Sequence, residues 1–96
     1  MNETLQEIVE LLSASGELRK PKTEGSKGLL VFNPRNLDIA SIEQKASTIQ
    51  GLRVINTPQQ TFFNNKPVPP HVWVGPAAPG VTITDGVASL SDELGL

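Results

Sequence analysis

The density of proline in residues 58–80 constrains the fold of this chain more than any other feature. This stretch holds six of the eight prolines. Because proline fixes φ and has no backbone N–H, we expect such a segment to lie outside the middle of a regular sheet. A segment of this kind is stiff, partly extended and poor in internal hydrogen bonds. The sequence therefore predicts a proline-rich arm.

The same arm carries most of the large aromatic side chains. Three of the four aromatic residues lie in it, together with the only histidine. Bulky aromatic side chains on a stiff segment suit contact with another protein. An ordinary loop folded over a small core would carry the same residues, so both interpretations stay open. On the contact hypothesis we predict six partner-binding residues: Phe62, Phe63, Pro69, Pro70, His71 and Trp73.

Trp73 has two alternative placements. Residues 72–74 read as a short strand in which Trp73 faces away from both valines. If the valines point inward, Trp73 and His71 share the outer face; if they point outward, Trp73 is the largest residue of the core. Residues 64–67 resemble a turn that brings residues 61–63 back toward residues 72–74. The result is either a hairpin with a proline-stiffened loop or a projecting finger, and the two are compatible.

The first half of the chain indicates helices and strands in alternation. Residues 3–13 place Leu5, Ile8, Val9 and Leu12 on one face of a helix. A polar connector without periodicity follows over residues 16–28, and we expect it to be flexible. Residues 29–32 form a continuous apolar run, which is typical of a buried strand.

A strand–helix–strand unit continues from that apolar run. We expect a helix over residues 39–50, with Asp38 as its N-cap and Gly51 in the left-handed conformation at its end. Residues 52–57 read as the second strand. The short links predict two parallel strands joined by a right-handed crossover.

The C-terminal part contains a hairpin pattern. Asp85 and Gly86 separate two runs, residues 81–84 and 87–90, as in a two-residue type I′ turn. Residues 91–96 suggest a final helical turn. With 96 residues the chain reads as one small α+β domain: an N-terminal helix, the strand–helix–strand unit, the proline-rich arm and the C-terminal β-hairpin.

Composition argues against several classes of function. The chain has no cysteine and one histidine, and its carboxylates show no metal-ligand spacing, so we expect no metal site and no cofactor. Because no nucleophile or paired acid accompanies His71, we expect no enzymatic activity and no small-molecule substrate. A net charge of −2 with dispersed basic residues makes nucleic acid a poor partner.

These observations favour a structural or protein-interaction subunit of a larger assembly. A phage capsid accessory protein fits this description, although no motif carries that identity. The alternative is a small regulator or inhibitor that docks on one host enzyme or on nucleic acid. Other protein chains are the expected partners, self-association included. With no signal peptide pattern and no long apolar run, we expect a cytoplasmic or virion-associated protein without membrane contact.

Overall fold

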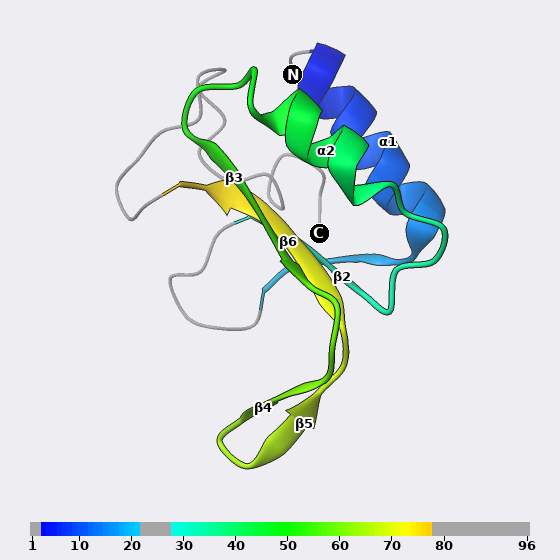
Figure 1. Ribbon diagram of the computed structural model, residues 1–96, viewed down its shortest axis with the longest axis vertical. Helices are drawn as coiled ribbons and strands as arrows, with labels where there is room; N and C mark the ends of the chain where they lie inside the picture. The colour runs from blue at the N-terminus through cyan, green and yellow to red at the C-terminus, as the bar shows by residue number, and fades with distance from the viewer. Residues whose placement is uncertain (1–2, 22–27, 78–96) are drawn as a thin grey trace.

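The computed structural model describes residues 3–21 and 28–77. Within these residues two helices cover one face of a four-stranded antiparallel sheet, and a separate two-stranded sheet extends away from it (Figure 1). This arrangement confirms the predicted α+β class. In chain order the elements are α1 (Glu3–Ser15), β1 (Leu18–Arg19), β2 (Leu29–Phe32), α2 (Ile39–Ala46), β3 (Leu52–Thr57), β4 (Thr61–Phe63), β5 (Lys66–Val68) and β6 (His71–Pro76).

The apolar stripe of α1 supplies the centre of the core. Leu5, Ile8 and Leu12 are almost completely buried, as their helical spacing predicts. The helix continues beyond residue 13 to Ser15, whose hydroxyl donates to the Leu12 carbonyl at 2.8 Å. A Cβ on Gly16 would lie 3.0 Å from Val31 Cγ1. Gly16 therefore lets the chain leave the helix in close contact with β2.

Helix α2 begins where the sequence predicts and ends earlier. Asp38 Oδ1 accepts from the Ser41 N–H at 3.1 Å, which confirms the N-cap. The helix ends at Ala46 instead of reaching residue 50. The Thr48 and Ile49 amides bond to carbonyls three residues back, at 3.2 and 3.0 Å, so the chain tightens into 3₁₀-type turns. Gly51 follows these turns with φ of 85°, which confirms its left-handed conformation.

The strand order separates the two strands of the strand–helix–strand unit. The order is β1-β2-β6-β3, and every neighbouring pair is antiparallel. Strands β2 and β3 run in the same direction, as expected for a crossover, because each pairs antiparallel with β6. They do not bond to each other, since β6 lies between them. The unit is therefore a split β–α–β arrangement.

The central position of β6 corrects the expectation for the proline-rich arm. Residues 71–76 belong to that arm, yet they form an inner strand of the sheet. The prolines are not spread evenly through the arm: residues 71–75 contain none, and Pro76 ends the strand. A proline-free run of this length is long enough to pair on both sides.

The connector after α1 is also more ordered than predicted. Leu18 and Arg19, which lie inside the segment expected to be a flexible loop, form β1 and pair with Val31 and Leu30 of β2. Residues 22–27 lie outside the described residues. The predicted C-terminal hairpin over residues 81–90 and the predicted turn over residues 91–96 lie outside them as well.

Candidate protein-contact surface

Strands β4 and β5 form a hairpin with a two-residue turn. Phe63 pairs with Lys66, and the turn residues Asn64 and Asn65 have φ of 52° and 64°. Two consecutive left-handed residues define a type I′ turn, which asparagine tolerates better than most residues. The sequence predicted a turn here. It predicted the wrong partner strand, because residues 61–63 pair with residues 66–68 and not with residues 72–74.

Proline separates this hairpin from the main sheet. Pro58 follows β3 on one strand, and Pro69 and Pro70 precede β6 on the other. In a continued register Pro69 would face residue 59 at the next bonding pair, and it has no N–H to donate, so the β3–β6 ladder ends here. The hairpin then continues beyond the edge of the helical layer and forms the lower end of the molecule in Figure 1. The observed hairpin projects from the body, as in the projecting-finger alternative, but it is not the predicted hairpin of residues 61–63 with residues 72–74.

Two hydrogen bonds hold the base of the hairpin against the body. The Pro70 carbonyl accepts from the Asn33 amide at 2.7 Å. The Pro69 carbonyl lies 2.9 Å from His71 Nδ1. Because a carbonyl can only accept, Nδ1 carries the proton in this contact. Pro69, Pro70 and His71 are half-buried, so they position the hairpin at its base.

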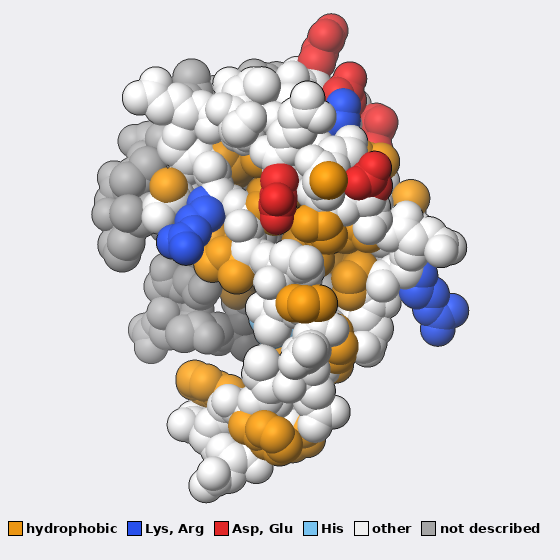
Figure 2. All heavy atoms as spheres, viewed as in Figure 1, with side chains coloured by type: hydrophobic (Ala, Val, Ile, Leu, Met, Phe, Trp, Pro, Cys, Tyr) orange, Lys and Arg blue, Asp and Glu red, His pale blue; other side chains and the backbone are white. Residues whose placement is uncertain are grey.

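The two phenylalanines of β4 are largely exposed. Phe62 is 70% exposed and Phe63 is 65% exposed. Successive residues of a strand point to opposite faces, so the ribbon presents one aromatic ring on each side. Figure 2 shows hydrophobic side chains on this projecting part, at the bottom of the view. These rings therefore contribute little to the core of the described domain.

Trp73 lies on the face of the sheet that points away from the helices, which we call the outer face. Val72 and Val74 are fully buried on the helix side, so the placement with outward valines and Trp73 in the core is wrong. Trp73 is half-buried and lies opposite Leu30 and Ile55 on the neighbouring strands. It is therefore separate from the exposed pair at the hairpin.

A second aromatic group on the outer face was not anticipated. The rings of Phe32 and His71 meet edge to face, with centroids 5.9 Å apart. The Arg19 guanidinium lies 5.7 Å from the Phe32 centroid, within cation–π range. The run of residues 29–32 hid this arrangement, because every residue in it is apolar. In the structure Leu29 and Val31 are buried and Phe32 faces outward, half-buried.

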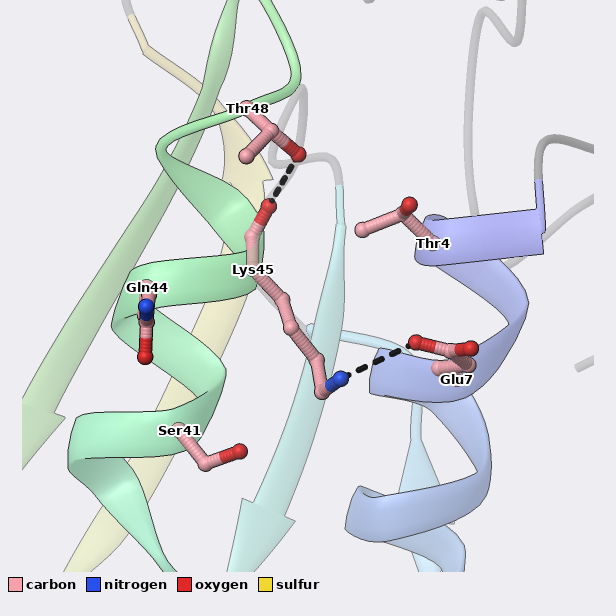
Figure 3. A pocket seen from close by; sticks show the side chains of 6 residues that line it. All are labelled: Thr4, Glu7, Ser41, Gln44, Lys45 and Thr48. Carbon is pink, nitrogen blue, oxygen red and sulfur yellow. Dashed lines mark hydrogen bonds and ion pairs between the residues drawn. The ribbon is translucent and has the colours of Figure 1, made fainter.

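A polar hollow lies between the two helices. It has a volume of about 330 Å³ and is lined by Thr4, Glu7, Ser41, Gln44, Lys45 and Thr48. The Lys45 ammonium bridges it with a 3.0 Å ion pair to Glu7, and the Thr48 hydroxyl donates to the Lys45 backbone carbonyl at 2.7 Å (Figure 3). Both partners of this ion pair are partly exposed to solvent.

The described part of the chain has neither a candidate metal centre nor a membrane-spanning helix. No group of three or more histidine, cysteine, aspartate or glutamate residues there could hold a metal ion. No helix in residues 3–21 and 28–77 is long and apolar enough to cross a membrane.

Fold and surface together define a small two-layer α+β protein with an aromatic hairpin projecting from one end of its sheet. Comparison of the chain with protein-family models, with curated proteins and with solved structures gave no match. The predicted partner-binding role of the six arm residues stays a prediction. The structure separates these residues into an exposed pair, Phe62 and Phe63, an anchoring group at the hairpin base, and Trp73 on the outer face.

Proposed function

We propose that this chain is a non-enzymatic subunit that binds another protein chain through the β4–β5 hairpin. It would serve in a larger assembly, of which a phage capsid is one example. One observation carries the proposal: Phe62 and Phe63 are 70% and 65% exposed on a ribbon that projects from the body. Phenylalanine, like tyrosine and tryptophan, is enriched in the buried centre of protein interfaces.

The energetics of the hairpin favour binding over self-packing. Fully burying one phenylalanine side chain contributes roughly 1.5–3 kcal/mol, and the two rings obtain little of this within the described chain. The turn and the flanking prolines already restrict the backbone of the hairpin. A partner therefore gains contact with an ordered ribbon and loses little conformational entropy in binding it.

The charge on the hairpin favours a protein partner over nucleic acid. Lys66 is the only charged residue in β4, β5 and their turn. Nucleic-acid binding takes most of its non-specific affinity from several phosphate contacts, which one lysine cannot supply. A discrete enzyme inhibitor would also use a protein contact, but it would form a one-to-one complex instead of a repeated assembly.

Site-specific photo-crosslinking tests the proposal. A photoreactive phenylalanine analogue replaces Phe62 in one variant and Phe63 in another, and each is irradiated in the native source. We expect both positions to crosslink to the same protein. Glu10 on the exposed side of α1 is the matched control position, and we expect no such product there.

The products discriminate between the candidate functions. A protein crosslink from Phe62 and Phe63 that is absent at Glu10 supports the hairpin contact. The mass of the native complex then separates a repeated assembly from a one-to-one inhibitor complex. Crosslinks to nucleic acid alone, or equal yields at all three positions, would contradict the proposal.

A further inference from the structure

Strand β3 forms one edge of the described sheet, and its backbone orientation can be deduced. The Ala77 amide donates to the Gly51 carbonyl at 2.8 Å, just beyond the pair of Leu52 with Pro76. In an antiparallel ladder such a bond flanks a pair that does not exchange hydrogen bonds itself. Pro76 agrees with this assignment because it has no N–H. The ladder therefore bonds through Arg53, Ile55 and Thr57.

The alternate residues of β3 direct their backbone groups away from β6. These are Leu52, Val54 and Asn56. The Leu52 amide already donates to the Ile49 carbonyl at 3.3 Å. Val54 and Asn56 therefore supply the two donors that face outward along this edge. In Figure 1, β3 lies in front of β6, so the sheet edge that β3 forms is turned toward the viewer.

This edge has few of the features that usually prevent strand addition, and Arg53 is its only charged residue. The six pairs of β3 with β6 are continuous, without a bulge, and β3 contains no proline and no lysine. Ile55 is 40% exposed on the outer face. Edge strands are normally protected by charge, proline or distortion. The β5 strand shows such protection, because the outward-facing position opposite Phe62 is Pro67.

We propose that β3 pairs with β3 of a second copy of this chain, antiparallel about a twofold axis at Ile55. The inference does not rest on the hairpin function, because it uses neither Phe62 nor Phe63. In this register Val54 of each copy faces Asn56 of the other, and both exchange two hydrogen bonds. All four outward donors are then used. The two sheets become one continuous sheet.

The sequence of β3 complements itself in this register. The two Ile55 side chains meet on the outer face, where directly opposed apolar residues pack closely. Arg53 faces Thr57 of the second copy, so the two arginines do not oppose each other. Leu52 faces Pro58, and neither of them has an outward donor to lose. Pairing centred on Val54 would instead place Arg53 against the exposed Ile55.

Mass and amide exchange of the full chain test this pairing together. Sedimentation is measured from about 1 µM to about 200 µM, since a dimer must respond to concentration by mass action. We expect a monomer–dimer equilibrium. We expect the Arg53, Ile55 and Thr57 amides to be protected at every concentration, and the Val54 and Asn56 amides to gain protection only as the dimer forms.

Each other outcome overturns the pairing. A monomer throughout the range contradicts it, as does a dimer in which Val54 and Asn56 exchange freely. Protection of the Val54 and Asn56 amides in the monomer would show that residues of the same chain already pair with this edge. An open series of larger oligomers contradicts the closed twofold arrangement.

A charge placed at the axis gives a second test. Ile55→Lys opposes two like charges, and we expect it to raise the dimer dissociation constant by about tenfold or more. Gln59→Lys adds the same charge beyond β3 and should leave the constant nearly unchanged. Retained protection of the Arg53 and Thr57 amides verifies the fold of each variant; if Ile55→Lys fails this check, Ile55→Thr replaces it. Unchanged dimerisation in a folded variant contradicts the proposal.

Discussion

Backbone conformations with positive φ explain why glycine or asparagine occupies several positions of this chain. Asn33, Asn36, Asn64 and Asn65 all have positive φ, and each lies in a turn or connection outside the helices and strands. Asparagine adopts this conformation at modest cost. Gly28 differs from them, because its φ of 111° lies outside the usual left-handed region and its surroundings leave no space for a side chain.

Gly28→Ala should therefore destabilise the domain by roughly 1–3 kcal/mol. A Cβ at this position would collide with the Val74 carbonyl oxygen and lie 3.0 Å from Trp73 Nε1. Chemical denaturation measures the loss. Gly16→Ala is the matched control for crowding without backbone strain, because its Cβ would lie 3.0 Å from Val31 Cγ1 and 3.6 Å from the Phe32 carbonyl oxygen while its φ is not positive. An equal loss in both variants would show that backbone strain at Gly28 is not the cause.

For the truncation of Trp73 we predict a loss of folding stability of intermediate size. Truncation of a fully buried tryptophan costs roughly 3–5 kcal/mol. Trp73 is half-buried on the outer face, so we expect Trp73→Ala to cost about 1–2 kcal/mol by area lost. Its fluorescence in the monomer should be partly accessible to an aqueous quencher. Complete protection from the quencher, with a loss above that range, would indicate that the outer face is covered.

At the scale of elements, local chemistry made several features predictable. The α1 stripe, the Asp38 cap and the positive φ of Gly51 each depend on residues close in sequence. The position of β6 between β2 and β3 depends on pairing between distant segments, which periodicity does not encode. Strand β1 was missed because two residues in a polar connector carry no periodic signal.

The candidate surface was predictable in composition and not in arrangement. The aromatic content of residues 62–73 pointed to this part of the chain. Its division between an exposed tip and the outer face depends on where the β3–β6 pairing ends in three dimensions, at the pair of Thr57 with His71. The outward orientation of Phe32 was hidden by the uniformly apolar strand around it.

Helix α1 provides a prediction at this same scale. Ile8 is fully buried between the helices and the sheet, so Ile8→Ala should cost roughly 2–4 kcal/mol. Gln6→Ala, on the exposed side of the same helix, should change the free energy of unfolding by less than about 0.5 kcal/mol. Thermal or denaturant unfolding distinguishes the two. Tolerance of Ile8→Ala would remove α1 from the core.

At the scale of the whole molecule, the domain divides into a body that carries the core and a hairpin that does not. Among the residues that the structure describes, every buried core residue belongs to α1, β2, β6, α2 or the turn that follows α2. The hairpin forms its own sheet and keeps its aromatic side chains exposed. On the proposed function, stability and partner contact belong to different parts of one chain.

This division predicts that the hairpin can be removed without unfolding the body. In this variant a four-residue turn made of glycine and asparagine replaces residues 59–69. It keeps the Asn33–Pro70 hydrogen bond and loses the hydrogen bond from His71 to Pro69. Since one hydrogen bond contributes about 1 kcal/mol and a shorter loop costs less entropy to close, we expect the melting temperature to change by only a few degrees.

The same variant should lose the partner that crosslinks to Phe62. Phe62→Ser with Phe63→Ser, which keeps the ribbon, separates the rings from the backbone as the binding element. Collapse of the fold in the shortened chain, or full partner binding without the hairpin, would show that contact and stability are not divided in this way.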